Sequence, residues 1–512
     1  MPNLQRMGKD KVLNHHHEVP YRVLEHKYNF GDKKTGSMIV HGDNLEALKS
    51  LLPQYEGKVK CCYIDPPYNT GNEGRVYNDN VNHPKIKKWL HQVVGKEGDD
   101  LSRHDKWLCM MYPRLKLLHK LLAENGAIFI SIDDSEQANL KLIMDEIFGG
   151  NNFVANIIRQ HSIQPKGYLG KFSVHHNYTF VYQKSPQFVL GNLDRTDEHN
   201  KAYSNPDNDP RGKWRSGDVR NALYRPNLIY DITTPSGKII KAPEKGRRRS
   251  KETLQERIKT GEIVFSKDQK RIIRKIYLDS IEGRAPETIW FGKDVGTTRD
   301  ANKELKEIFD NDVPFDTPKP VKLIEQIMSL CVADNDIILD SFAGSGTTGH
   351  ATLNFNLQNK GNNKFILIEM EDYADNITAE RIKRVIKGYG DKKGTGGGFD
   401  YYTLGEALFD EDDNLNESID TEIIKQYIRY TETQTDYTPS SKKYLLGTYK
   451  RTEYYFYYEH DRATTLDLKF LGTLGKTDSY RLIYADICLL SKAFLAKHNI
   501  IFKKIPRDIT RF

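Results

Sequence analysis

A tetrapeptide near the N-terminus combines groups that suit contact with a flat ring bearing an amino group. Asp65, Pro66, Pro67 and Tyr68 directly follow VKCCYI (59–64), a nearly continuous apolar run typical of a buried parallel strand. The two prolines fix the backbone and remove two amide donors. The Asp65 carboxylate and the Pro66 carbonyl are then acceptors held in one place, beside the aromatic face of Tyr68. A plain proline turn, with Asp65 as a cap, is the alternative interpretation.

A glycine-rich turn in the second half of the chain has the composition of a cofactor-binding loop. FAGSGTT (342–348) directly follows DIILD (336–340), which is expected to be a strand. A turn of this kind between a strand and a helix lets the backbone approach a ligand closely, and the helix N-terminus offers free amides. The dinucleotide pattern GxGxxG is matched only in part, by Gly344, Gly346 and Gly349, and the P-loop pattern GxxxxGK[ST] is absent.

An acidic residue follows the turn at the spacing expected for a ribose contact. KFILIE (364–369) reads as the next strand and places Glu369 at its end. A carboxylate at this position accepts hydrogen bonds from ribose hydroxyls. Together, the turn and Glu369 predict an adenosine-type cofactor, whereas Glu369 alone would be taken for a surface carboxylate.

Alternating apolar runs and amphipathic stretches predict the α/β framework that must position both motifs. The rhythm breaks near residue 156 and returns at about Pro318, and its two halves together are about the right size for one doubly wound sheet. Expected strands cover MIVH and its turn (38–43), 59–64, 127–132, 336–340 and 364–369; expected helices cover 44–52, 107–123, 140–148 and 319–331.

Changes in composition predict five segments. KKGTGGG (392–398) is typical of a linker, and the segment that follows it is nearly neutral and rich in tyrosine. The predicted segments are an irregular polar lead-in (1–37), a first α/β half (38–155), a basic insertion (156–300), a second α/β half (301–390) and a C-terminal domain (391–512).

The excess positive charge of the chain is concentrated in its centre. Residues 151–300 contain 28 Lys and Arg against 17 Asp and Glu, whereas the whole 512-residue chain carries a net charge of +7. Contact with a polyanion is the functional interpretation, and a solvated face is the plain one. Arg247, Arg248 and Arg249 are the candidate phosphate contacts, with a solvated loop as the alternative.

Composition excludes several other classes of protein. No apolar run reaches 18 residues, so we expect no transmembrane helix and no membrane partner. The polar N-terminus lacks the apolar core of a signal peptide. The five cysteines form no CxxC pair, which argues against a disulfide framework or a zinc ribbon, and His15, His16 and His17 are consecutive, so we expect no metal site. The predicted location is a reducing cytoplasm.

The two motifs carry a specific resemblance. DPPY followed later by FxGxGTT resembles S-adenosyl-L-methionine-dependent DNA adenine-N6 methyltransferases, and the order of the motifs resembles the β class of that family. HGDNLEAL, YIDPPYNTGNEGRVYND, HDKWLCMMYPRLKLL, FDTPKPVKLI, DSFAGSGTTGHATL and FILIEMEDYADNITAERIKRVI further resemble modification (Mod) subunits of type III restriction–modification systems, over about residues 38–390. Ser341 departs from the family, which often has an aromatic residue there.

The resemblance implies an architecture for the whole chain. It predicts a Rossmann-like S-adenosylmethionine-dependent methyltransferase sheet with a circularly permuted motif order. Segments 38–155 and 301–390 would be its catalytic and cofactor-binding halves, 156–300 an inserted target recognition region and 391–512 an α+β appendix. The strands that end at Asp65 and Ser341 would be neighbours at the topological switch point.

The resemblance also assigns roles to the catalytic motif. The target adenine must leave the duplex; Tyr68 would stack on it, and Asp65 and the Pro66 carbonyl would accept hydrogen bonds from its N6 amino group. The nitrogen lone pair is then available for direct displacement on the methyl sulfonium, without a covalent intermediate.

Cofactor contacts are implied by the resemblance in the same way. Glu369 would hold the ribose, Thr347 would cap the following helix, and Lys319 would lie near the cofactor carboxylate, with a solvated lysine as the alternative. Asp43 would lie near the cofactor adenine or, equally, cap the helix that begins after it. The remaining residues expected to contact the cofactor are Asp340, Phe342, Ala343, Gly344 and Gly346.

Partners follow from the resemblance as well. It implies double-stranded DNA as substrate, a homodimer, and a separate restriction (Res) helicase–nuclease subunit. The alternatives are a solitary adenine methyltransferase, a methyltransferase of RNA or protein, and a non-catalytic DNA-binding specificity subunit. Enzymes of RNA or protein usually carry NPPY after the cofactor motif, whereas Asp65 precedes it here, and intact motifs disfavour a non-catalytic subunit.

Overall fold

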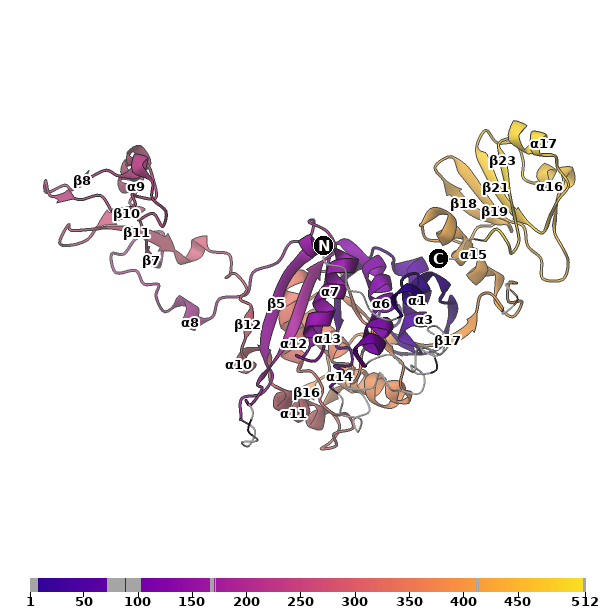
Figure 1. Cartoon of the computed structure of the whole chain (residues 1–512), viewed down its shortest axis with the longest axis horizontal. Helices are drawn as coiled ribbons and strands as arrows, with labels where there is room; N and C mark the ends of the chain where they lie inside the picture. Colours follow the sequence, from indigo (N-terminus) through magenta and orange to yellow (C-terminus); the bar gives the residue numbers. More distant parts are fainter. Residues whose placement is uncertain are drawn as a thin grey trace. The chain divides into compact units, whose positions relative to one another are not determined.

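The computed structural model describes residues 8–70, 88, 103–165, 170, 172–410, 412 and 414–509. The chain forms two compact units (Figure 1): one comprises Met1–Leu190 with Glu287–Phe512, and the other comprises Gly191–Pro286. In the described part of the chain, no helix is both long and apolar enough to cross a membrane.

A ten-stranded mixed sheet organises the larger unit. Its five central strands, from β2 to β4 in spatial order, run parallel to one another, as the alternation of strands and helices predicts. In spatial order the strands are β1 (Arg22–Gly31), β17 (Gly398–Ala407), β2 (Met38–His41), β14 (Lys364–Glu369), β13 (Ile337–Asp340), β3 (Val59–Ile64), β4 (Leu122–Ile132), β6 (His176–Gln183), β5 (Phe153–Gln160) and β12 (Ile289–Trp290).

Helices cover both faces of this sheet. Both faces of the sheet are apolar, as β14 shows. Phe365 and Leu367 pack into the core on one face, and Ile366 and Ile368 pack into the core on the other. One face carries α3 (Asn44–Tyr55), α6 (Arg103–Leu121) and α7 (Gln137–Phe148); the other carries α11 (Thr298–Ile308), α13 (Thr347–Asn359) and α14 (Glu380–Lys387). Helix α12 (Val321–Cys331) packs against α13, β3 and β4.

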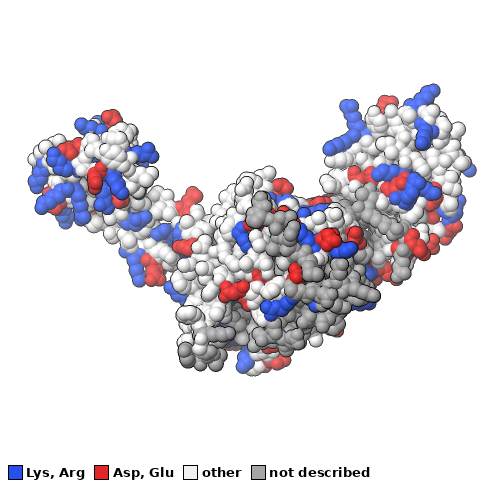
Figure 2. Space-filling model, in the orientation of Figure 1, with Lys and Arg blue, Asp and Glu red and all other residues white. Residues whose placement is uncertain are grey.

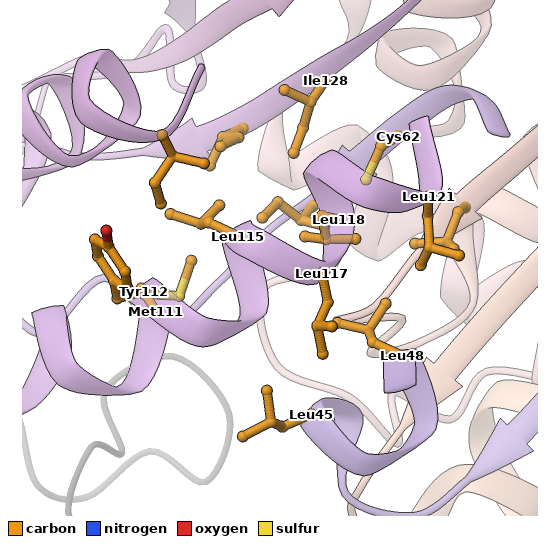
Figure 3. Packing of buried hydrophobic residues seen from close by; sticks show 14 of the residues in the cluster. Leu45, Leu48, Cys62, Met111, Tyr112, Leu115, Leu117, Leu118, Leu121 and Ile128 are labelled. Atoms are coloured by element: carbon orange, nitrogen blue, oxygen red, sulfur yellow. The ribbon is translucent and has the colours of Figure 1, made fainter. Parts of the chain in front are cut away.

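The core beside the predicted catalytic strand is built from leucines at helical spacing. Figure 3 shows Leu115 and Leu118 of α6 pointing toward Cys62 and Ile128 of the sheet, while Leu48 of α3 meets Leu117. This packing fixes the position of β3, and therefore that of Asp65, which directly follows it.

The predicted lead-in and the predicted boundary at residue 390 are both wrong. Residues 22–31 form β1, which pairs with β17, and β17 in turn pairs with β2. The first α/β half therefore contains a strand contributed from beyond the glycine-rich segment. Most of β1 is only half buried, so it lacks the continuous apolar run that marks the central strands. The two lysines that begin the glycine-rich segment form β16 (Lys392–Lys393), which pairs with β15 (Gly388–Tyr389) in a short hairpin.

The inserted unit is smaller than the predicted 156–300. Strands β5 and β6 belong to the main sheet, so the compact unit begins only at Gly191 and ends at Pro286. It has a three-stranded antiparallel sheet and a small core of its own. Its elements are α8 (Asp197–Asn200), β7 (Trp214–Gly217), β8 (Ile232–Thr233), β9 (Ile239–Ile240), α9 (Lys251–Lys259), β10 (Ile263–Phe265) and β11 (Ile272–Tyr277).

The C-terminal region is α/β and not α+β, because its strands alternate with helices and β19, β21 and β23 pair in parallel. The tyrosine-rich run packs inside this region: Tyr454, Tyr455 and Phe456 are buried. The elements are α15 (Thr421–Thr433), β18 (Leu445–Tyr449), β19 (Thr452–Phe456), β20 (Thr465–Leu466), α16 (Leu468–Thr473), β21 (Tyr480–Ala485), β22 (Ile487–Cys488), α17 (Lys492–Lys497) and β23 (Ile500–Lys504).

The role of β17 can be tested by truncating one side chain. Phe399 is 0% exposed and belongs to the core formed with α11, α13 and α14. We expect Phe399→Ala to lower the free energy of unfolding by about 3–5 kcal/mol, because it leaves a cavity. Leu357→Ala on α13 is the control, since Leu357 is 59% exposed, and its effect should stay within about 0.5 kcal/mol. Urea unfolding measures both, and equal effects would contradict the placement of β17.

Candidate active site

The two sequence motifs meet because their strands are neighbours. Strands β3 and β13 pair in parallel, with Ile338 opposite Cys61 and Leu339 opposite Cys62. The carboxyl ends of parallel strands lie at the same edge of a sheet, where ligands bind in open α/β folds. Asp65 and the glycine-rich turn therefore leave the sheet side by side.

An ion pair joins the catalytic motif to the segment that precedes α12. The Lys319 ammonium hydrogen-bonds the Asp65 carboxylate, and both side chains are 10% exposed. The same ammonium lies 5.2 Å from the centre of the Tyr68 ring, and the Tyr68 hydroxyl donates to Asp65 Oδ1 at 2.8 Å. Burial lowers the pKa of Lys319, an effect that Asp65 opposes. Lys319 is therefore a buried partner of the catalytic motif and not a solvated lysine.

The backbone of the catalytic motif is anchored by a tryptophan that the sequence analysis counted only as part of a helix. Trp107 of α6 is fully buried, and its indole N–H donates to the Pro67 carbonyl at 2.7 Å. Asn69, which follows the motif with φ of 58°, donates to the Arg103 carbonyl at 3.2 Å and to Glu136. The sequence signal for this role was a tryptophan, an aromatic residue with an N–H donor, in the helix predicted over 107–123.

Glu369 shapes the glycine-rich turn. Its Oε2 accepts the Gly344 N–H at 2.8 Å, and its Oε1 accepts the Glu371 N–H at 3.0 Å. Gly344 and Gly346 have φ of 51° and 81°, in the left-handed region that favours glycine. Glu369 thus lies at the end of β14 and against the turn, as its position in the sequence predicts; contact with a ribose stays a prediction.

Thr347 does not cap α13, contrary to the sequence prediction. The cap position is Gly346, which has no side chain to offer, and Thr347 is the first helical residue. Its hydroxyl instead donates to the Lys319 carbonyl at 3.1 Å and accepts from Arg381 at 2.9 Å. Thr347 therefore ties the turn to the segment that carries Lys319.

Arg381 supports the turn from behind and was missed by the sequence analysis. It is fully buried in α14 and also donates to the Ser345 hydroxyl at 2.9 Å. An ion pair with Glu304 at 3.5 Å balances its charge in part. The signal was an arginine among the apolar positions of ITAERIKRVI, where a cation is rarely buried without a polar partner.

Two buried carboxyl groups flank the turn. Asp340 accepts the Phe342 N–H at 3.0 Å and the Thr348 hydroxyl at 2.5 Å. Burial raises the pKa of Asp340 to about 7 and that of Glu369 to about 8, and the hydrogen bonds from their donors oppose the shift in both cases.

Asp43 caps α3, which is one of its two predicted roles. Its Oδ1 accepts the N–H groups of Leu45 at 2.8 Å and Glu46 at 3.2 Å. The next residue, Asn44, donates to the Ser341 carbonyl at 3.1 Å and so connects this loop to the strand end before the turn.

Most of the predicted residues surround one narrow cavity of about 20 Å³. Ligand pockets usually measure roughly 300–1,000 Å³, so a nucleoside-sized ligand requires the lining side chains to move apart. The cavity is lined by Tyr63, Asp65, Phe315, Thr317, Pro318, Lys319, Asp340, Phe342, Ala343, Gly344, Ser345, Thr347 and Thr348. Gly346, Glu369 and Asp43 support this site without lining the cavity.

Arg247 cannot be a phosphate contact in this conformation. It is 2% exposed, and its guanidinium donates to the carbonyls of Tyr230, Ile240 and Lys241 within its own unit. These acceptors make it a structural residue, whereas Arg248 is exposed and Arg249 is partly so.

A basic groove lies in the same unit. It has a volume of about 780 Å³, and its charged lining consists of Arg215, Arg220, Lys241, Arg247, Arg271 and a single carboxylate, Asp218. Figure 2 shows Lys and Arg gathered over the part of the molecule that Figure 1 labels β7, β8, β10, β11 and α9.

Comparison with known proteins assigns the family. A family described as DNA methylase, comprising N6 and N4 methyltransferases, matches residues 59–380. The chain therefore belongs to this family of DNA methylases.

Individual relatives agree with this family. The chain is 34% identical to the Mod subunit of the type III restriction–modification enzyme StyLTI of Salmonella typhimurium, over 74% of this chain and 62% of that subunit. It is 35% identical to the type II methyltransferase M.KpnI of Klebsiella pneumoniae, over 65% of this chain and 81% of that protein. A solved PvuII DNA methyltransferase, cytosine-N4-specific, aligns over 69% of this chain and 89% of its own, at 13% identity and a TM-score of 0.35.

The buried carboxyl of Glu369 predicts a pH dependence of stability. Its pKa rises from the ordinary 4.5 to about 8 on folding, so between these values the folded state binds a proton that the unfolded chain does not. The free energy of unfolding therefore falls as pH rises through this window. Between pH 6 and pH 8 we expect a loss on the order of 2 kcal/mol from Glu369.

Urea unfolding at the two pH values measures this loss. Glu369→Gln should remove this contribution, so that its change in stability between the two pH values differs from the wild-type change by about that amount. Glu124→Gln is the control, because Glu124 is exposed. A variant at Glu369 that keeps the full pH dependence would contradict the shifted pKa.

Proposed function

We propose that this chain transfers a methyl group from S-adenosyl-L-methionine to the N6 amino group of a flipped adenine in double-stranded DNA, as the modification subunit of a type III restriction–modification system. The observation that carries the proposal is the contact of Asp65 with Lys319, whose carbonyl accepts a hydrogen bond from Thr347 of the glycine-rich turn. It brings an acceptor for an amino group beside the turn expected to hold the cofactor. The chain spans 62–67% of the length of the StyLTI and EcoP15I Mod subunits. The activity of the whole protein is therefore part of this proposal.

The site residues fit the cofactor by their chemistry. Glu369 lies where a ribose hydroxyl would be accepted, the glycine turn admits close approach of backbone, and Lys319 supplies a cation for a carboxylate. The cofactor supplies a methyl group on a sulfonium. Lys319 would hold the cofactor carboxylate in place of Asp65, and Asp65 would then be available to the target base.

The chain's own residues orient the amino nitrogen. Tyr68 stacks on the flipped base, while Asp65 and the Pro66 carbonyl accept the two amino hydrogens. With both amino hydrogens held, the nitrogen lone pair would be free for the methyl group that a bound cofactor would supply, and the Asp65 carboxylate would accept the proton that the nitrogen releases. Most of the rate enhancement comes from orientation and from acceptors fixed in advance.

Strand order supports a circularly permuted methyltransferase sheet. The catalytic strand β3 precedes the cofactor strands β13 and β14 in the chain, yet the three are consecutive in the sheet. A permuted order changes the connections and preserves this adjacency.

A solitary adenine methyltransferase is the second candidate. The 35% identity to M.KpnI, a type II methyltransferase of which this chain covers 81%, favours it. A homodimer, a partner restriction subunit and a cytoplasmic location stay predictions from the resemblance; light scattering of the full chain tests the dimer.

Catalysis by Asp65 is tested best with an isosteric variant. Asp65→Ala would leave the buried Lys319 without its partner, which destabilises a protein. Asp65→Asn keeps the shape and one acceptor, and we expect it to lower methyl transfer to DNA by roughly 10²-fold or more. Cofactor affinity, measured by calorimetry, should change only a few-fold.

Asp316→Asn is the control for this test, because Asp316 is an exposed acid three residues before Lys319. It should keep wild-type turnover. Near wild-type methylation by Asp65→Asn would overturn the catalytic assignment.

The basic groove predicts how DNA binding depends on salt. Each lost phosphate contact should reduce the slope of log affinity against log salt by about 0.9. We expect replacement of Arg215, Arg220 and Arg271 by Gln to flatten the slope by up to about 2.7 and to weaken binding to all sequences alike. Fluorescence anisotropy at several salt concentrations measures the slope.

The control removes the same charge elsewhere. Lys442, Lys476 and Lys497 are exposed in the C-terminal region, and their replacement by Gln should leave the slope unchanged. Equal slopes for the groove variant and the wild type would reject the groove as the DNA surface.

A further inference from the structure

A row of buried polar side chains beside Tyr68 has no role in the mechanism above. Arg159, Asn177 and Thr179 are 1%, 7% and 0% exposed. Each has one polar atom without a hydrogen-bond partner among the described residues: Arg159 Nε, Asn177 Oδ1 and Thr179 Oγ1. Buried polar atoms are nearly always satisfied in native proteins, so three on one surface require an explanation.

Strand register places these side chains on one face of the sheet. Arg159 of β5 is directly opposite Asn177 of β6, and Ile157 is opposite Thr179. Thr179 is in turn opposite Ser131 of β4. Side chains at directly opposed positions share a face, so the polar row runs across β5, β6 and β4.

The row continues to the catalytic strand. The Ser131 hydroxyl lies 2.9 Å from the hydroxyl of Tyr63 on β3, two residues before Asp65. Tyr63 also lines the narrow cavity of the candidate active site. The polar face therefore ends at the site where Asp65 and Tyr68 meet.

Asn177 makes the direct connection. Its Nδ2 donates to the Tyr68 hydroxyl at 3.4 Å, and that hydroxyl donates to Asp65 Oδ1 at 2.8 Å. The carboxamide is thus next to the ring on which the target base is expected to stack. A carboxamide offers a donor and an acceptor side by side, which matches a ring nitrogen next to an exocyclic amino group.

We propose that Asn177 reads the target base, by donating from its carboxamide to a ring nitrogen that flanks the exocyclic amino group, N1 or N7 of adenine. Arg159 and Thr179 lie on the same polar face, at register positions next to Asn177. This inference rests on the proposed function. It assigns the recognition of the flipped base partly to β6 of the methylase sheet, outside both sequence motifs.

Base analogues test the inference at the level of single atoms. The substrates are duplexes in which the target adenine is replaced by 1-deazaadenine, which lacks N1, or 7-deazaadenine, which lacks N7. We expect the wild-type chain to methylate one of the two at least about tenfold more slowly than adenine. In Asn177→Ala, adenine itself should be slowed, and the difference between adenine and that analogue should disappear.

Two further variants separate base reading from structural support. Asn177→Asp has the same shape but no donor, so it should also lose the discrimination. Asn156→Ala is the matched control: Asn156 lies on β5 opposite Phe180, on the other face of the same strand pair, and its carboxamide oxygen is also buried without a partner among the described residues. It should keep the wild-type discrimination.

Three results would overturn the inference: wild-type rates within twofold for adenine and both analogues, an unchanged discrimination in Asn177→Ala, or full discrimination in Asn177→Asp. Failure of the proposed function looks different, because the wild-type chain would then not methylate unmodified DNA at all.

Discussion

The pairing of β3 with β13 is the constraint on which the site depends. Two segments almost 280 positions apart in the sequence become neighbours through two pairs of opposed residues. The residues of the candidate active site lie at the edge of the sheet where these strands end. The buried contact of Lys319 with Asp65 lies at the same edge, among the residues that follow both strands. Asp65 and Lys319 also both line the narrow cavity, so the ion pair is part of its wall.

Buried charged side chains at this edge of the sheet are paired with groups of opposite charge or with hydrogen-bond donors. Cations that would be costly to bury alone, such as Arg381 and Lys319, each face a carboxylate. Asp340 and Glu369 are held by backbone and hydroxyl donors, and burial shifts both toward the neutral form. Polar contacts from the strand ends and from α14 therefore hold the turn in place. Apolar packing holds β3, the strand that carries the catalytic motif.

Sequence reasoning predicted the central strands well, because a buried parallel strand is a continuous apolar run: 59–64 and 364–369 match β3 and β14 at both ends. It missed β1 and β17, because β1 has no fully buried position and neither strand is a continuous apolar run. It placed Asp65, Lys319 and the glycine turn together, but could not foresee that Thr347 faces Lys319. Arg247 shows most clearly what the sequence could not predict. A run of arginines does not reveal which of them is buried in the folded unit.

The position of β2 bears on how this protein is made. Residues 38–41 leave the ribosome early, yet the two strands that flank them, β14 and β17, end at residues 369 and 407. At about 5–20 residues per second, an apolar strand therefore waits tens of seconds for either neighbour. During that interval the insertion from Gly191 to Pro286, whose sheet and core are internal, can already fold. The edges of β2 thus stay unpaired while the intervening chain is made, and unpaired strand edges are prone to aggregation.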